Sequence, residues 1–276
     1  MFDIISRLRP ITLDAYADHA GVYHHNPIVK STQIYPEWWK SLKTHCEVAT
    51  ENSPIITPMS TLKVCEGLLD MYKNMFTIPL WTDLILKYDE HGNFAWKSSA
   101  EDTKIGHHPT AQFEHEEFND LIHMKITVPW QLQEKSGVNF QLFHSDWNKP
   151  SNMFKFRIPG GVLNYKYQVG ANCNMWLPKK ANADIDLYSG EPLLNILPLT
   201  ERKVVLKTHL IDLKEYNDMT SDLARGMLDG SIDMSQVGQI SQKKSAVFDT
   251  LTNGINQYKV DKVDDSEMID LLKLIS

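Results

Sequence analysis

Short runs in which apolar and polar residues alternate dominate the middle of the chain and predict β-strands. The clearest series is residues 184–212, DIDLYSGEPLLNILPLTERKVVLKTHLID. A Gly-Glu-Pro turn separates a short alternating strand from an apolar run that stops at Leu197-Pro198, and a second alternating strand covers residues 203–210. Three strands in so few residues, separated by Gly and Pro, predict the wall of an antiparallel β-sandwich or barrel.

Earlier segments continue this pattern. Strands are predicted over residues 78–88, 94–97, 121–126, 138–144, 154–158, 162–169 and 174–177, and residues 89–93 read as the turn of a hairpin. Strands at this spacing are typical of a sandwich, a jelly roll or a double-stranded β-helix. The fold class that we expect is therefore mainly β: an antiparallel jelly roll or double-stranded β-helix-like sandwich with peripheral helices.

Helical spacing is confined to a few segments. A short amphipathic helix is predicted over residues 36–42, another helix within 59–76, and two more over 213–227 and 265–275. We therefore expect a β-rich domain over residues 1–212, with an irregular segment 1–60 packed on it, and a helical C-terminal extension over 213–276. That extension either docks on its own core or anchors the chain on a partner subunit.

Composition narrows the range of partners. The net charge is −7, and no basic run is longer than the pairs Lys179-Lys180 and Lys243-Lys244, so we expect no nucleic-acid partner. No apolar stretch approaches the ~20 residues that span a bilayer, and the first residues lack the apolar core of a signal peptide. We therefore expect a soluble, cytoplasmic protein without a membrane partner. Its three cysteines should be reduced thiols.

Several short motifs occur in one order along residues 30–210. They are PEWWK (36–40), KVCEG (63–67), IPLWTD (78–83), GEPL (190–193) and ILPL (196–199), followed by Arg202. In this order the chain resembles a family of uncharacterised proteins found in tailed bacteriophages and some bacteria. It departs from that pattern at Cys65-Glu66, where such proteins often have Cys-Pro. The resemblance implies a phage-type origin, with the protein in the host cell cytoplasm or in a virion, and it carries no established activity.

The sharpest chemical hypothesis is a metal site formed by His144, Asp146 and His209. An H-x-D turn after one strand and a His on a distant strand are what a non-haem Fe(II) facial triad requires. Three ligands on one face of the metal leave the other face open for oxygen and a cosubstrate. Fe(II) is the cofactor that this site would take.

Two observations weaken the triad. A 2-oxoglutarate enzyme needs a cation near the second His, and the nearest ones that follow it are Lys214 and Arg225. Three H-x-acid triplets occur in the chain, a number that random placement of its His and acidic residues can produce. A hydrogen-bonded structural His is the alternative.

Other polar and aromatic groups have weaker interpretations. A loop rich in His and acids could bind Zn²⁺ or Ni²⁺ through His107, His108, His115, His123, Glu114, Glu116 and Glu117, or could simply be a solvated loop. His24-His25 has the same two interpretations. The seven Trp residues are scattered along the chain, which favours core packing over a sugar-binding face. No nucleophile elbow, Walker loop, dinucleotide fingerprint or HExxH motif is present, so catalytic residues stay unassigned.

Two functional classes follow from the sequence. The first is a phage-type protein without catalytic activity, a virion-associated or host-interacting module that forms a homo-oligomer or binds a virion or host protein. The second is a cupin-like or non-haem Fe(II) oxygenase that uses His144, Asp146 and His209. The first is favoured because the second lacks its cosubstrate cation.

Overall fold

The structure is a computed structural model, and everything below concerns the residues it describes. These are residues 9–50, 53–89, 94–100, 103–107, 113–150, 155–167, 170–171, 173–179 and 184–219. The protein is mainly β, and most strand pairs are antiparallel, as predicted. The described strands form five separate sheets that do not close into a barrel.

The largest sheet has five strands in the order β12-β11-β15-β5-β2. Their bounds are Gly161–Asn164, Asn139–His144, Pro192–Pro198, Phe76–Pro79 and Val29–Lys30. All neighbouring pairs are antiparallel, and β11 is held in register against β15 from Phe140↔Pro198 to His144↔Leu194. The sheet is therefore built from segments far apart in sequence.

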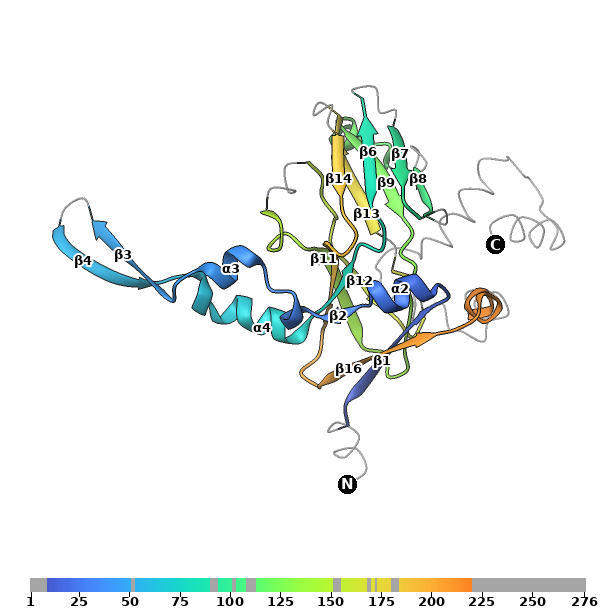
Figure 1. Cartoon of the computed structure of the whole chain (residues 1–276), viewed down its shortest axis with the longest axis horizontal. Coiled ribbons are helices and arrows are strands. Elements are labelled where there is room, and N and C mark those ends of the chain that lie inside the picture. The colour runs from blue at the N-terminus through green and yellow to red at the C-terminus, as the bar shows by residue number, and fades with distance from the viewer. Residues whose placement is uncertain are drawn as a thin grey trace.

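A three-stranded sheet, in the order β10-β1-β16, brings the start of the described chain against its end. The strands are Gln131–Glu134, Ile11–Ala17 and Val204–Leu210. The central strand β1 runs antiparallel to β10 and parallel to β16 (Figure 1). The prediction of an irregular segment over residues 1–60 is thus wrong for residues 11–17, where each alternate side chain from Ile11 to Ala17 is buried. This alternation was present in the sequence as ITLDAYA.

Two more three-stranded sheets lie together at the other end of the body (Figure 1). One has the order β13-β9-β8, with bounds Cys173–Pro178, Leu121–Ile126 and Ile105–His107. The other has the order β14-β6-β7, with bounds Asp184–Leu187, Leu84–Tyr88 and Phe94–Ser98. The β6–β7 pair confirms the predicted hairpin.

The three strands of residues 184–212 do not form one wall. Each belongs to a different sheet: β14 pairs with β6, β15 lies in the five-stranded sheet, and β16 pairs with β1. The turn after β14 explains the first change of sheet. Gly190 adopts φ +86°, a conformation that side chains disfavour, and its N–H donates to the Leu80 carbonyl at 2.7 Å. The Gly-containing turn therefore lets the chain leave the sheet of β14 and enter that of β15.

Two other strand predictions differ from the structure. The expected strand 78–88 is divided into β5 and β6, which belong to different sheets, because residues 80–83 turn the chain. Residues 155–158 of the expected strand 154–158 make only an isolated bridge, Arg157 to Trp176. Alternation alone did not distinguish a strand from an extended connection.

Short helices connect the strands. The α-helices are α2 (Ala20–His25), α3 (Glu37–Ser41) and α4 (Glu66–Asn74), and the 3-10 helices are η1 (Ser31–Gln33), η2 (Leu62–Val64) and η4 (Glu116–Phe118). The predictions over residues 36–42 and within 59–76 are confirmed by α3 and α4. Residues 213–219 are helical, and the rest of the predicted C-terminal extension, including 265–275, lies outside the described residues.

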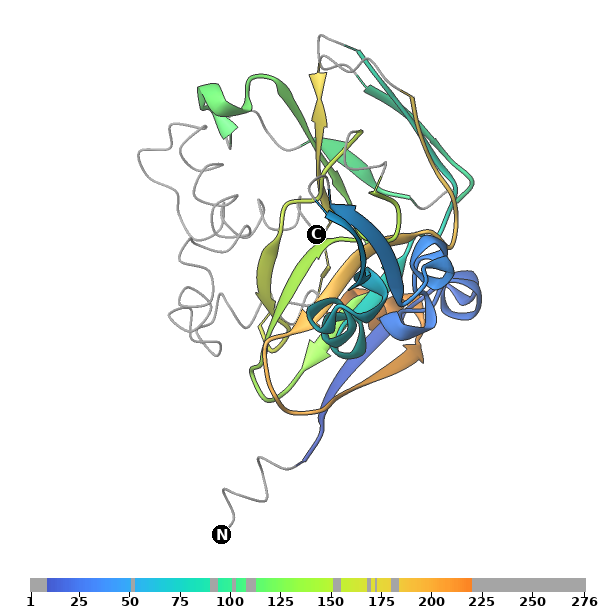
Figure 2. The same ribbon diagram turned by 90° about the vertical axis from the view of Figure 1, so that its left-hand side faces the viewer.

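One hairpin stands apart from the body. Strands β3 (His45–Thr50) and β4 (Ser53–Ser60) pair only with each other among the described strands. They project from one end of the molecule beyond α3 and α4 (Figure 1), and they point toward the viewer when the molecule is turned (Figure 2). We call residues 45–60 the arm, and α3, η2 and α4 the arm base.

The body has one large apolar core, to which all four multistranded sheets contribute. Phe140, Trp130, Leu13, Met124 and Ile185 are all nearly inaccessible to solvent within it. A second, smaller core lies under the arm base around Trp39, Leu68, Tyr72 and Met75. The three cysteines are free thiols, as predicted, and burial raises the pKa of the Cys173 thiol.

We expect Phe140→Ala to lower the free energy of unfolding by about 3–5 kcal/mol, because it removes a fully buried ring and leaves a cavity beside Tyr165. Chemical denaturation measures the change. The matched control is Ile85→Ala on β6, whose side chain is 40% exposed and which should cost less than about 1 kcal/mol. Equal losses in the two variants would contradict the assigned core.

Candidate functional site

His144 and Asp146 lie at the end of β11, as the sequence predicted. The His144 side chain is buried and its Nδ1 is 2.9 Å from Asp146 Oδ1, while its ring packs on Phe156 at 4.8 Å between centroids. Burial lowers the pKa of His144, an effect that the Asp146 carboxylate opposes and that Arg157 reinforces. The pair is therefore local, and it faces an aromatic ring of the core.

His209 lies on β16, in a different sheet. Its Nε2 is 2.8 Å from Asp14 Oδ1, and its ring stacks on Tyr16 with centroids 4.8 Å apart. Both partners come from β1, the parallel neighbour of β16. Cross-strand pairing between β1 and β16 thus accounts for both contacts of this imidazole.

The structure does not bring His144, Asp146 and His209 together. Instead it separates them into two His–Asp pairs, His144 with Asp146 and His209 with Asp14. Among the described residues, no group of three or more His, Cys, Asp or Glu side chains is placed to hold a metal ion. The Fe(II) triad expected from the sequence is not assembled here, because β11 and β16 lie in separate sheets rather than across one barrel mouth.

The described part of the His-rich loop has structural contacts. His115 caps η4, with its Nδ1 accepting from the Glu117 N–H at 3.3 Å. The His123 ring packs against Phe113 and Trp176, at centroid distances of 4.0 and 6.4 Å. His108 and the side chain of His107 lie outside the described residues. His24 and His25 are exposed at the end of α2.

A buried row of hydrogen-bonded polar side chains crosses the five-stranded sheet beside the turn that follows His144. We call this row the polar strip. The Ser31 and Thr77 hydroxyls are 2.7 Å apart, Thr77 donates to Asn195 Oδ1 at 2.8 Å, and Ser145 donates to the same oxygen at 3.0 Å. All four residues are buried. Because an unpaired polar group inside a protein is costly, the strip fixes which strands lie side by side.

The turn after His144 fastens the arm base to the body. Asn148 accepts from the Tyr72 hydroxyl of α4 at 3.0 Å and donates to the Ile34 carbonyl at 2.8 Å. The Trp38 indole N–H of α3 donates to the Trp147 carbonyl at 2.7 Å. Burial raises the pKa of the Tyr72 hydroxyl, which therefore stays a donor at neutral pH. We call residues 145–148 the mounting turn.

Aromatic packing makes the arm base compact. Tyr35 stacks on Trp39 at 4.2 Å and on Tyr72 at 4.8 Å between ring centroids. The Lys63 ammonium lies 4.4 Å from the Trp39 ring and donates to the carbonyls of Trp39 and Lys40, at the C-terminal end of α3. Cations are favoured at that end of a helix, so Lys63 ties η2 to α3 at the root of the arm.

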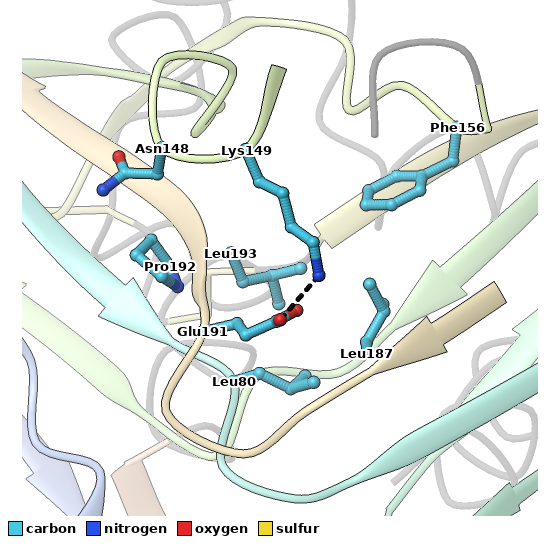
Figure 3. A pocket seen from close by; sticks show the side chains of 8 residues that line it. All are labelled: Leu80, Asn148, Lys149, Phe156, Leu187, Glu191, Pro192 and Leu193. Carbon is cyan, nitrogen blue, oxygen red and sulfur yellow. Dashed lines mark hydrogen bonds and ion pairs between the residues drawn. The ribbon is translucent and has the colours of Figure 1, made fainter. Parts of the chain in front are cut away.

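A small cavity of about 140 Å³ lies behind the mounting turn (Figure 3). Its walls include Leu80, Phe156 and Leu187, and the side chains of Lys149 and Glu191 point toward one another at 2.6 Å. Pockets that bind cofactors and small substrates are typically ~300–1,000 Å³. This cavity is too small for such a ligand, and its single ion pair is internally satisfied.

Sequence reasoning missed the mounting turn and the arm. The sequence signal for the turn is the tripeptide His144-Ser145-Asp146, which the sequence pattern assigns to metal ligands instead. The signal for the arm base was the motif PEWWK together with the motif KVCEG. Lys63 of the second motif donates to the carbonyls of Trp39 and Lys40 in the first. Residues of these two motifs therefore lie together in the structure.

Comparison with known proteins adds no identity. No protein-family model matches the chain, and no curated protein matches it either. Among the described residues, no helix is long and apolar enough to cross a membrane.

We expect protein stability to depend on pH through His144. Its pKa is lower in the folded than in the unfolded chain, so the unfolded state binds the proton more readily. The stabilisation is complete above the unfolded value of 6.5 and is lost as the pH falls below it toward the folded pKa. Urea unfolding at pH 7.5 and pH 5.5 measures this loss.

His144→Gln should remove that part of the pH dependence. The control His45→Gln, at an exposed position on the arm, should keep it. A His144→Gln variant that loses as much stability on acidification as the unmodified chain would show that other groups cause the effect.

Proposed function

We propose that the protein is a non-catalytic assembly module, of the virion-associated or host-interacting kind, whose arm contacts a protein partner. The observation that carries this proposal is the free-standing hairpin β3–β4 on a rigid base (Figure 1). The resemblance to phage proteins agrees with such a role.

The unpaired edges and the marginal stability of the arm support the proposal that it binds a partner. A two-stranded hairpin is only marginally stable alone in water, since it has no third strand and no core. Both outer edges of the arm lack a strand partner among the described residues, and the Met59 side chain is 53% exposed. Monomeric proteins usually shorten or cover such edges. A partner that pairs with the arm would supply the missing contacts.

The arm base supports the same proposal. A mobile surface loop needs no buried support, whereas this arm is joined to the body by stacked aromatics and by the Tyr72–Asn148 and Trp38–Trp147 hydrogen bonds. These contacts hold the arm in one direction. A fixed direction reduces the conformational entropy lost when a partner binds.

Two alternatives have less support. The Fe(II) oxygenase would need His209 beside His144 and Asp146, but Asp14 holds His209 elsewhere. The other candidate for contact with a partner subunit is the C-terminal extension, residues 213–276. The described part of that segment docks on its own chain, where the Gln131 side chain donates to the Tyr216 carbonyl at 2.8 Å. The proposal therefore rests on the arm.

Site-specific photo-cross-linking tests the proposal. A photoreactive phenylalanine analogue in place of Met59, in the chain produced in its native cellular context, should give one discrete protein adduct on irradiation. The matched control is the same analogue in place of Tyr188, which is 56% exposed but lies outside the arm.

The adduct should be present with the cross-linker at position 59 and absent with it at position 188. Its mass then reports the partner. No adduct at position 59, or the same adducts from both positions, would contradict a role for the arm in assembly.

A further inference from the structure

A second surface of the molecule, a groove with free strand edges, could bind a strand of the arm. A groove of about 890 Å³ lies between the ends of two sheets. One wall is β16, the last strand of the three-stranded sheet, and the other is β2, the last strand of the five-stranded sheet. No described strand pairs with the outer edge of either. The seven residues of β16 offer a free edge roughly 20 Å long, at about 3.3 Å per residue.

The groove combines apolar and cationic side chains. Val204, Val205 and Leu206 of β16 line it and are only half-buried. The charged side chains in its lining are four cations, Lys30, Lys73, Arg202 and Lys203, and one acid, Glu201. The lining thus carries an excess of three positive charges.

Two of these cations lack an acidic partner among the described residues. Lys73 pairs with Asp70, and Arg202 donates to the Arg9 carbonyl. Lys30 instead lies 4.5 Å above the Phe76 ring, and Lys203 makes no ion pair with a described residue. Burial, followed by repulsion from Lys203, lowers the pKa of Lys30. Positive charge in the groove is therefore incompletely compensated.

The arm has the opposite character. Residues 45–60 contain Glu47 and Glu51 and no Lys or Arg, so the arm carries two negative charges. Its strand β4 contains Pro54 and Pro58, which cannot donate a backbone hydrogen bond and are normally found where a strand edge faces solvent. Strand β3 has no proline. The edge of the arm that can add to a sheet is therefore that of β3.

We propose that β3 of one copy adds to the free edge of β16 in the groove of a second copy, with Glu47 near Lys203 and Lys30. This proposal rests on the proposed function and names the partner of the arm. In a single copy the arm points away from β16 (Figure 1), so the contact is between copies. Main-chain hydrogen bonds would supply affinity, and the charges would supply register and orientation.

The charges also disfavour a competing arrangement. Lys203 and Lys207 lie at or beside the free edge of β16, and two such edges placed together would bring like charges into contact. An acidic strand meets no such repulsion. Each copy has one arm and one groove, so the contact joins two different surfaces.

Sedimentation velocity of the purified full chain, over a range of concentrations, tests the proposal. The chain should self-associate, and Glu47→Lys and Lys203→Glu should each weaken association by about tenfold or more. The double variant should recover most of that loss, because the reversed charges attract again. The matched controls Glu114→Lys and Lys155→Glu lie outside the arm and the groove, and they should associate like the unmodified chain.

Three results would overturn the proposal. The first is a chain that stays monomeric at every concentration. The second is a double variant that remains as weak as the single variants. The third is a random-sequence oligonucleotide whose binding is lost in Lys203→Glu while self-association is unchanged, which would assign the groove to nucleic acid. Thermal unfolding of each variant confirms that it is folded.

The cross-linking experiment separates this proposal from the proposed function. An adduct of twice the chain mass from position 59 supports both. A discrete adduct of another mass, together with a purified chain that stays monomeric, would still support the arm as an assembly element. The same result would contradict the proposal that its partner is a second copy of the chain.

Discussion

The mounting turn fixes the position of the arm base relative to the body, and the rest of the structure depends on this constraint. Residues 145–148 leave the five-stranded sheet through Ser145, whose hydroxyl joins the buried strip at Asn195, and reach the arm base through Asn148. One four-residue turn thus links a satisfied polar network inside the sheet to the packed aromatics outside it. Loss of either end would leave buried polar groups unpaired, which is why the arm and the body hold one relative orientation.

This arrangement also explains why the two His–Asp pairs do not combine into one metal site among the described residues. The His144 pair sits at the root of the mounting turn and faces Phe156, whereas the His209 pair joins β1 to β16. The first pair is a local contact at the end of β11, and the second stabilises a junction between segments distant in sequence. Lys30 and Lys203, which lack an acidic partner among the described residues, instead line the groove beside two free sheet edges.

Much of the local structure could be predicted from the sequence, but its assembly could not. Alternation located β9 and β11 closely, and the apolar run that ends at Pro198 located β15. Pro36 and the spacing of Leu68 and Tyr72 located α3 and α4. Periodicity reports which face of a strand is buried and not which sheet receives it. It therefore could not show that β14, β15 and β16 separate, that β1 is parallel to β16, or that His209 meets Asp14 rather than His144.

Contact with a partner should stabilise the backbone hydrogen bonds between β3 and β4, while the arm base already fixes the direction of the arm. Hydrogen–deuterium exchange of the backbone amides of β3 and β4, in dilute monomer and in the associated protein, tests this central claim most directly. We expect fast exchange in the monomer, since an isolated hairpin is marginally stable, and strong protection on association, while β11 stays protected in both. Arm amides that are as protected as β11 in dilute monomer, or equally unprotected in both states, would contradict the account.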